Sequence, residues 1–307
     1  MNTDLLTLAA LDASDMNRLF DRAIDLKARH NRGINDQPLL GKSVGLVFDK
    51  HSTRTRLSFE VAAIQLGGVP IFISSKDTQM ARNEPVKDTA RVLSRYLDVV
   101  AIRTYSQSFL EEFAEAADIP VINALTDLYH PCQVLSDLLT VIEKKGGYKD
   151  LKIAWLGDGN NMAHSWINAA AALDLTLTLA CPEAYLPDSE IIESAAAKGG
   201  RISVVKDPYE AAEDADVVNT DVWASMGQES EQEKREAVFK DFQVNSELMA
   251  RAKSDAIVMH CLPAHRGEEI TEDVLEGPQS VVWDQTENKL HMHKAILDVL
   301  VSKGYRV

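Results

Sequence analysis

Short continuous apolar runs alternate along this chain with stretches in which apolar residues recur at helical spacing. Residues 44–48 form the first run, of strand length, and residues 69–73 form the second. Between them, Leu57, Val61 and Ile64 follow the three- and four-residue spacing of a helix face. Two consecutive glycines then end the helix. The pattern therefore predicts a strand, a helix and a second strand in succession.

The same alternation continues to the end of the chain, apart from a polar stretch at 76–88 that is expected to be a loop. Further strands are expected at 99–103, 121–124, 152–156, 175–180, 201–205, 216–219, 256–260 and 280–283. Helices are expected as two segments within 3–32 and at 89–97, 110–117, 130–144, 161–173, 188–198, 232–240, 245–252 and 291–303. Strands that alternate with helices predict parallel sheets covered on both faces, hence an α/β fold. The glycine-rich stretch 146–150 is the expected seam between two doubly wound domains.

The turn after the first strand has the sequence Ser-Thr-Arg-Thr-Arg at residues 52–56. Ser52 is the expected helix N-cap, so this segment lies in the first turn, where backbone N–H groups lack partners and the helix dipole is positive. Hydroxyl groups and the guanidinium groups of Arg54 and Arg56 converge there, which predicts an anion site suited to phosphate. The alternative is a capped helix whose arginines are solvated.

Polar clusters follow several of the expected strands. In doubly wound sheets, ligands bind beyond the carboxyl ends of the strands, and six clusters in two domains predict an interdomain active site. Besides residues 52–56, the clusters are Arg103-Thr104, His130-Pro131-Cys132-Gln133, residues 157–161, residues 221–227 and residues 260–263.

Each cluster has a functional and a structural interpretation. Arg103 can bind phosphate through paired N–H groups or form a salt bridge. His130 can polarise a carbonyl group or cap the helix that Pro131 begins, and Gln133, one turn later, can bond an amide. Asp221 and the nearby Ser225 can hold an amine and a carboxylate or form a capping turn.

The remaining reactive residues indicate less. Cys261 can act as a nucleophile or be a buried, inert thiol. Residues 157–162 match a dinucleotide fingerprint only loosely, so a nicotinamide cofactor is not expected, nor is any other cofactor. His291 and His293 point to different sides of a helix, and we infer no metal site.

Composition limits the classes of partner that this chain is expected to bind. The 307 residues include 32 Lys and Arg against 47 Asp and Glu, for a net charge of −15, which argues against nucleic acid and anionic membranes. No apolar run approaches the ~20 residues of a membrane span, and the N-terminus lacks the pattern of a secretory signal. Three cysteines without CxxC spacing favour a reducing cytoplasm.

Four motifs together resemble the ornithine carbamoyltransferases. They are STRTR at 52–56, HPCQ at 130–133, DVWASMGQE at 221–229 and HCLPAHRGEEI at 260–270. The resemblance implies transfer of the carbamoyl group of carbamoyl phosphate to the δ-amine of L-ornithine, in arginine metabolism, by trimers of this chain or multiples of trimers. It also implies two domains joined by two helices: residues 1–133 with the last helix, 288–307, for carbamoyl phosphate, and 147–285 for ornithine.

The resemblance also implies roles for individual residues. Those expected at carbamoyl phosphate are Ser52, Thr53, Arg54, Thr55, Arg103, His130, Gln133, Cys261, Leu262, Lys289 and, from a neighbouring subunit, Gln79. Those expected at ornithine are Asn161, Asp221, Ser225 and Met226. Arg54, Arg103, His130 and Cys261 are the expected catalytic residues. Lys289 departs from the family, which usually has arginine there; lysine keeps the charge but loses the bidentate fork.

Two other functions remain open at this point. One is a sister carbamoyltransferase that acts on putrescine or an N-acylated ornithine, since a putrescine enzyme needs no group to hold a carboxylate. The other is a non-catalytic, phosphate-sensing protein of the same fold.

Overall fold

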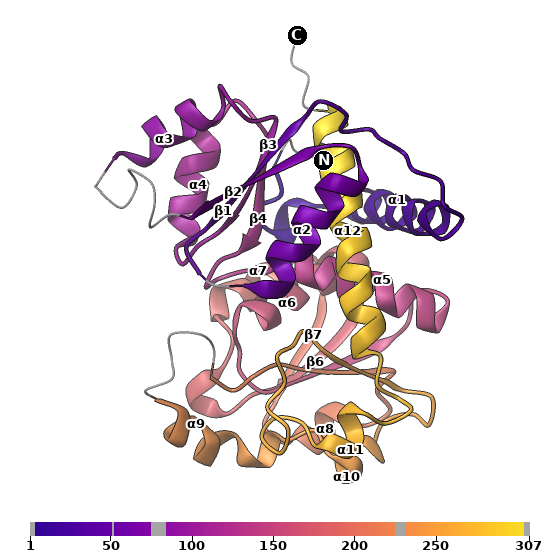
Figure 1. Cartoon of the computed structure of the whole chain (residues 1–307). Coiled ribbons are helices and arrows are strands. Elements are labelled where there is room, and N and C mark those ends of the chain that lie inside the picture. Colours follow the sequence, from indigo (N-terminus) through magenta and orange to yellow (C-terminus); the bar gives the residue numbers. More distant parts are fainter. Residues whose placement is uncertain (1–3, 51, 75–83, 225–230, 304–307) are drawn as a thin grey trace. The chain divides into compact units, whose positions relative to one another are not determined.

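The computed structural model describes residues 4–50, 52–74, 84–224 and 231–303 and divides the chain into two compact units (Figure 1). One unit comprises Met1–Leu139 with Glu287–Val307, and the other comprises Thr140–Thr286. The chain passes from one unit to the other within two helices, α5 (Pro131–Lys145) and α12 (Val282–Lys303).

The first unit contains a parallel sheet of four strands in the order β2-β1-β3-β4. Its strands are β1 (Ser43–Phe48), β2 (Val69–Ser74), β3 (Val99–Arg103) and β4 (Val121–Leu125). Its remaining helices are η1 (Leu8–Ala10), α1 (Ala13–Asn31), α2 (Thr53–Gln65), α3 (Val86–Leu93) and α4 (Gln107–Ala116). Because β1 connects to β2 on one side and β3 lies on its other side, the strand order reverses between β1 and β3.

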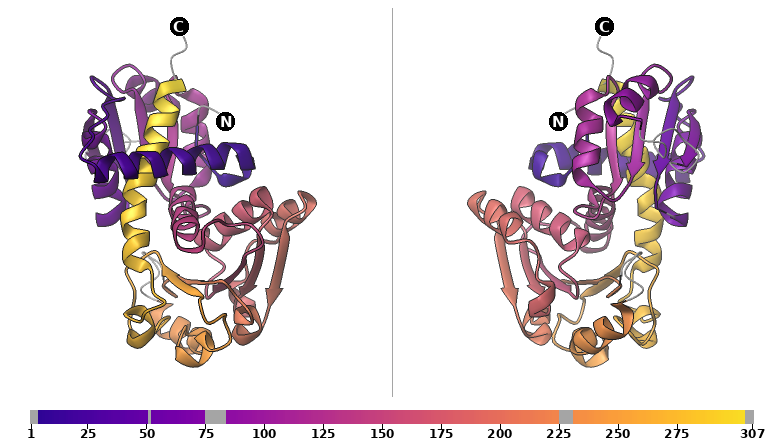
Figure 2. Two further views of the ribbon diagram at one scale, coloured as in Figure 1. Left: turned by 90° about the vertical axis from the view of Figure 1, so that its right-hand side faces the viewer. Right: turned by 90° about the vertical axis from the view of Figure 1, so that its left-hand side faces the viewer.

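Helices cover both faces of this sheet. Apolar residues of α3 and α4 pack on β1, β3 and β4 around Val100 and Phe113, both fully buried. Helix α2 lies on the opposite face (Figure 1). Helix α1 crosses α12 (Figure 2), where Arg22 Nε donates a 2.5 Å hydrogen bond to Asp298 Oδ2. The C-terminal helix is thereby fixed to the first unit.

The second unit contains a parallel sheet of five strands in the order β7-β6-β5-β8-β9. Its strands are β5 (Lys152–Leu156), β6 (Thr176–Ala180), β7 (Arg201–Val205), β8 (Val217–Thr220) and β9 (Ile257–His260). Its helices are α6 (Asn161–Leu173), η4 (Glu183–Tyr185), α7 (Ser189–Ala197), α8 (Pro208–Ala212), α9 (Gln232–Phe239), η6 (Lys240–Phe242), α10 (Ser246–Met249) and α11 (Glu272–Leu275). Here the strand order reverses between β5 and β8.

The predicted α/β fold with two parallel sheets is confirmed, and most predicted elements agree with the observed ones within a few residues. The strand expected at 280–283 is wrong. Ser280 forms only an isolated bridge to Val258, and α12 begins at Val282. A short apolar run does not distinguish a strand from the start of a buried helix. Here the backbone N–H of Gln285 donates to the backbone carbonyl of Val281, which is the bond of a helix.

Several helices also differ from the prediction. Helix α12 begins at Val282, nine residues before the expected start at residue 291, and α11 was not predicted. Helix α3 begins at Val86, inside the expected loop, and ends at Leu93 instead of residue 97. Helix α8 was not predicted, although Asp207 caps it and Pro208 stands at its first position, which is a recognisable start signal. The rest of the expected loop, residues 76–83, lies outside the described residues.

Candidate active site

The first group of candidate residues lies where the strand order of the first sheet reverses. Phe48 at the end of β1 pairs with Arg103 at the end of β3, so the segments that follow both strands begin at the same edge. Ser52 is the N-cap of α2 as predicted, and its Oγ accepts a 3.3 Å hydrogen bond from the amide of Thr55. Ligands of doubly wound sheets bind at such a reversal point. The turn that carries residues 52–56 is therefore in the expected place.

The arginines of this turn differ in their surroundings. Arg56 Nε donates to Glu60 at 2.9 Å, and its guanidinium carbon lies 3.6 Å from the centre of the Phe72 ring. Arg54 forms no hydrogen bond or ion pair with any residue in the described ranges. No described residue therefore occupies its five N–H donors, whereas Arg56 is held by Glu60 of its own helix and by Phe72 of β2.

His130 immediately precedes α5 and is only 5% exposed. Burial lowers its pKa well below the ordinary value, and the charges of Lys289 and Arg103 lower it further. The imidazole is therefore neutral at physiological pH. A neutral ring can polarise a carbonyl oxygen through one N–H group but carries no positive charge of its own.

Gln133 and Lys289 form one buried hydrogen-bonded chain with Asp137. Lys289 Nζ donates to Gln133 Oε1 at 2.8 Å, and Gln133 Nε2 donates to Asp137 Oδ1, also at 2.8 Å. All three side chains are buried in the first unit. Lysine cannot form the paired hydrogen bonds of a guanidinium. Its single ammonium group nevertheless bonds Gln133, which is expected at carbamoyl phosphate as Lys289 is.

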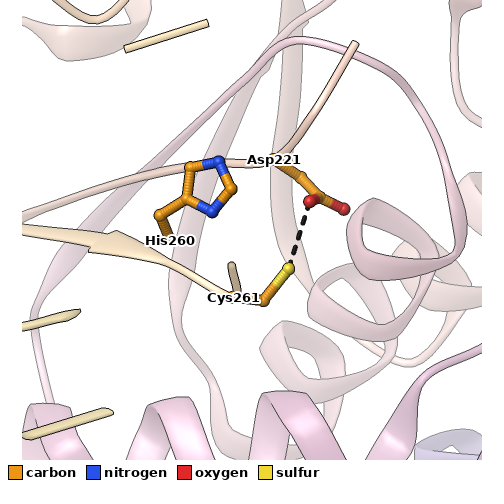
Figure 3. Close-up of side chains that lie close together, drawn as sticks. All are labelled: Asp221, His260 and Cys261. Atoms are coloured by element: carbon orange, nitrogen blue, oxygen red, sulfur yellow. Dashed lines mark hydrogen bonds between the residues drawn. The ribbon is translucent and has the colours of Figure 1, made fainter. Parts of the chain in front are cut away.

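The second group of candidate residues lies in the second unit, at the reversal between β5 and β8. Asp221 follows β8, and its carboxylate accepts hydrogen bonds from Asn160 Nδ2 at 3.1 Å, from the amide of Val222 at 2.8 Å and from Cys261 Sγ at 3.1 Å (Figure 3). Asn160 also caps α6 through its Oδ1. Asp221 is thus a fixed, largely buried acceptor that is suited to an ammonium group.

His260 holds the turn that carries Cys261 and Leu262. Its Nδ1 accepts a 2.8 Å hydrogen bond from the amide of Leu262, so the hydrogen is on Nε2, which donates to Glu269 at 2.9 Å. Both side chains are fully buried. Nothing in the sequence pairs His260 with Glu269, because the two residues lie nine positions apart in irregular chain.

Two clusters among the described residues offer several metal-ligand atoms within 4.8 Å of one another. They are Asp221, His260 and Cys261 (Figure 3), and His265, Glu268 and Glu269. In the first cluster, an ion on Nδ1 of His260 would have to displace the amide of Leu262. In the second cluster, Glu269 Oε1 already accepts from His260 and from the amide of His265. The other carboxylate oxygen of Glu269, Oε2, is buried and has no hydrogen-bond partner among the described residues.

The other predicted residues divide as follows. Thr53 is exposed at the first position of α2, and Thr55 is buried. Asn161 begins α6, but the asparagine that bonds Asp221 is its neighbour Asn160. The remaining three, Gln79, Ser225 and Met226, lie outside the described residues.

Sequence reasoning missed a buried ion pair beside this second group. The guanidinium of Arg235 donates to Asp158 at 2.8 Å and to the carbonyl of Trp223 at 2.7 Å, and its central carbon lies 4.5 Å from the centre of the Tyr185 ring. Burial raises the pKa of Asp158 to about 6, although Arg235 opposes this shift. Arg235 lies in a highly charged stretch, so nothing in the sequence marks it as buried.

Comparison with known proteins defines the class. Residues 3–143 match the carbamoyl-P binding domain of the aspartate/ornithine carbamoyltransferases, and residues 149–300 match their Asp/Orn binding domain. The chain belongs to the aspartate/ornithine carbamoyltransferase family.

Its relatives narrow the class further. The ornithine carbamoyltransferase of Syntrophus aciditrophicus is 58% identical over 98% of this chain and 100% of its own length. That of Desulfotalea psychrophila is 59% identical over 97% and 99%. The solved structure of ornithine carbamoyltransferase from Pyrococcus furiosus is 47% identical, covers 98% of this chain and 97% of its own, and has a TM-score of 0.94.

Proposed function

We propose that this chain transfers the carbamoyl group of carbamoyl phosphate to the δ-amine of L-ornithine, giving L-citrulline and phosphate. The observation that carries this conclusion is the match to ornithine carbamoyltransferases over nearly the whole of both chains. The direct test is to incubate the purified protein with both substrates. We expect citrulline and phosphate in a one-to-one ratio, and phosphate release without citrulline would contradict the proposal.

The first unit is proposed to bind carbamoyl phosphate. Its phosphate group lies at the first turn of α2, where the dipole, the available N–H groups and Arg54 favour an anion, with Arg103 adding a second guanidinium. Residues proposed to contact this substrate are Ser52, Thr53, Arg54, Thr55, Arg103, His130, Gln133 and Lys289, together with Cys261, Leu262 and Gln79. We propose that residues 1–133 and 288–307 form the domain that binds carbamoyl phosphate, and that residues 147–285 form the domain that binds ornithine.

Asp221 is proposed to hold the α-ammonium group of ornithine, aided by Asn161, Ser225 and Met226. Three hydrogen-bond donors orient its carboxylate, so a cationic ligand meets a fixed acceptor. A carboxylate in that place favours the charged form of an amine and is therefore unsuited to deprotonate the attacking one. Asp221 is thus an anchor and not a base.

The attacking δ-amine must be neutral. An alkyl ammonium has a pKa of about 10.4, so deprotonation near pH ~7.5 costs roughly 4 kcal/mol unless neighbouring cations reduce it. As the amine adds to the carbonyl carbon, negative charge develops on the carbonyl oxygen, which His130, Arg103 and Thr55 are proposed to stabilise. The bond to phosphate then breaks, Arg54 and the helix N-terminus stabilise the leaving group, and the departing phosphate takes up the proton that the attacking nitrogen loses. No covalent intermediate on Cys261 is required.

Self-association as a trimer, or a multiple of trimers, is also proposed. Support comes from one apolar face of the first unit: Leu57 and Ile64 of α2 and Val69 and Ile71 of the edge strand β2 are exposed, Ile64 by 61%. Exposed apolar side chains beside an unpaired strand edge are typical of an interface. Light scattering should give about three times the 33.9 kDa of one chain, or a multiple of that mass.

A cytoplasmic location and a role in arginine biosynthesis complete the proposal. All three cysteines are free, which is consistent with a reducing compartment. None of the described helices is both long and apolar enough to span a membrane. A solved relative, 40% identical with a TM-score of 0.92, is the anabolic ornithine carbamoyltransferase of Campylobacter jejuni. Fractionation of cells that produce the chain, and loss of growth without arginine when it is deleted, would test both statements.

A further inference from the structure

His293 lies one helical turn after Lys289 on α12 and is fully buried. Its ring stacks on Phe59 of α2, with the ring centres 3.7 Å apart and the planes inclined by 13°. Its Nδ1 atom lies 2.9 Å from Ser58 Oγ. The C-terminal helix therefore contacts α2 one turn after the segment that carries the anion site.

The direction of this hydrogen bond follows from the partners of Ser58. The hydroxyl of Ser58 donates its single hydrogen to the carbonyl of Thr55 at 3.1 Å. With that donation made, its oxygen accepts from His293, and on this basis the ring hydrogen is assigned to Nδ1. Burial and the charge of Lys289 lower the pKa of His293 well below its ordinary value, so the ring stays neutral.

This chain of donors ends in the anion turn. Ser58 holds the carbonyl of Thr55, and the amide of the same residue donates to Ser52 Oγ at 3.3 Å. The backbone of the first turn is thus fixed on both sides of Thr55. We propose that His293 is a positioning residue for carbamoyl phosphate: through Ser58 it holds the first turn of α2 in the conformation that binds the phosphate group. This inference rests on the proposed function.

A packing role alone does not account for a histidine here. With its hydrogen on Nδ1, the ring leaves Nε2 as a bare acceptor that is buried and has no hydrogen-bond partner among the described residues. Burying such an acceptor is unfavourable, and phenylalanine would stack on Phe59 without that cost. What histidine adds is the bond to Ser58.

The test compares two amides that differ in reach. In His293→Asn the amide nitrogen takes the place of Nδ1, whereas in His293→Gln it takes the place of Nε2; both lose the ring. We expect His293→Gln to raise the KM for carbamoyl phosphate and the inhibition constant of inorganic phosphate by about tenfold, and His293→Asn to stay within about threefold of the parent. The KM for ornithine should be unchanged in both. Equal effects of the two variants, or equal shifts for both substrates, would overturn the inference.

Ser58→Ala tests the same hydrogen-bonded chain with a smaller change of side chain. It should also raise the KM for carbamoyl phosphate by about tenfold, and the double variant with His293→Gln should be no worse than either single variant, because both remove the same chain. Additive effects would show that His293 does not act through Ser58. If the parent protein forms citrulline and these variants do too with unchanged constants, only this inference is wrong. A parent protein without citrulline formation refutes the proposed function instead.

Discussion

Lys289 on α12 donates a 2.8 Å hydrogen bond from Nζ to Oε1 of Gln133 on α5, and both side chains are buried. The two residues are separated by 156 positions in the sequence. The C-terminal helix thereby brings a cation to the start of α5, where its charge also lowers the pKa of His130. This contact supports the proposal that Lys289 serves at carbamoyl phosphate, where the resemblance led us to expect arginine.

Replacing Lys289 tests that contact. Lys289→Met removes the charge and leaves Gln133 Oε1 without this donor, so we expect the KM for carbamoyl phosphate to rise by about tenfold or more. Lys289→Arg keeps a donor and should stay within about fivefold of the parent, because a guanidinium can reach the same oxygen. Steady-state kinetics with ornithine held at saturation measures both. An unchanged KM in Lys289→Met would exclude a role for this residue at carbamoyl phosphate.

The two arginines of the anion turn should differ in their effects. Arg54→Ala removes donors that no described residue uses, and we expect turnover to fall by about 100-fold or more, as for other losses of a group that stabilises developing charge. Arg56→Ala is the matched control, since that guanidinium is held by Glu60 and Phe72, and it should reduce turnover by less than about tenfold. A larger loss of turnover in Arg56→Ala than in Arg54→Ala would show that the phosphate group does not bind at Arg54.

Asp221 should act on ornithine alone. Asp221→Asn keeps the shape of the side chain but loses the charge that holds an ammonium group, so the KM for ornithine should rise by about 100-fold. The dissociation constant of carbamoyl phosphate, measured by calorimetry without ornithine, should not change. Asp241→Asn, at an exposed position of the same unit, is the control. If the asparagine variant bound ornithine normally, the anchor would have to be another group.

Asp158 should make stability depend on pH. Burial raises the pKa of this carboxyl to about 6, above its value in the unfolded chain. The folded state therefore binds the proton of Asp158 more tightly than the unfolded chain does. The contribution of this proton to the free energy of unfolding is complete below pH ~4 and is lost as the pH rises through about 6. Relative to Asp158→Asn, the thermal midpoint of the parent should fall between pH ~4 and ~7. A difference between the two midpoints that stays constant over this interval would contradict the shift.

Local patterns predicted the elements because each carries its own signals. Ser52 was identifiable as an N-cap from its hydroxyl and the apolar spacing after it, and the structure shows that cap. The apolar residues 281–283 failed as a strand because a run that short is compatible with either structure. Long periodic segments were therefore predicted reliably, whereas short elements and the ends of helices were not.

The candidate site was predictable only where a motif or a strand end marked it. Arg103 ends β3, and His130 and Asp221 follow β4 and β8, so each lies at the carboxyl edge of its own sheet, where ligands of such sheets bind. The bonds of Lys289 to Gln133, of His293 to Ser58 and of Arg235 to Asp158 join segments far apart in sequence. Only the packing of whole helices determines them, and no local pattern encodes that packing.

The identity of the amine acceptor is the central claim, and a direct comparison of acceptors tests it. The measurement is kcat/KM for carbamoyl transfer to L-ornithine, N-acetyl-L-ornithine and putrescine, under one set of conditions and with carbamoyl phosphate at saturation. Since Asp221 is proposed to hold an α-ammonium group, which acylation removes and putrescine lacks, ornithine should exceed both others by at least about 100-fold. Equal or higher values with either of the other two amines would contradict the proposed function.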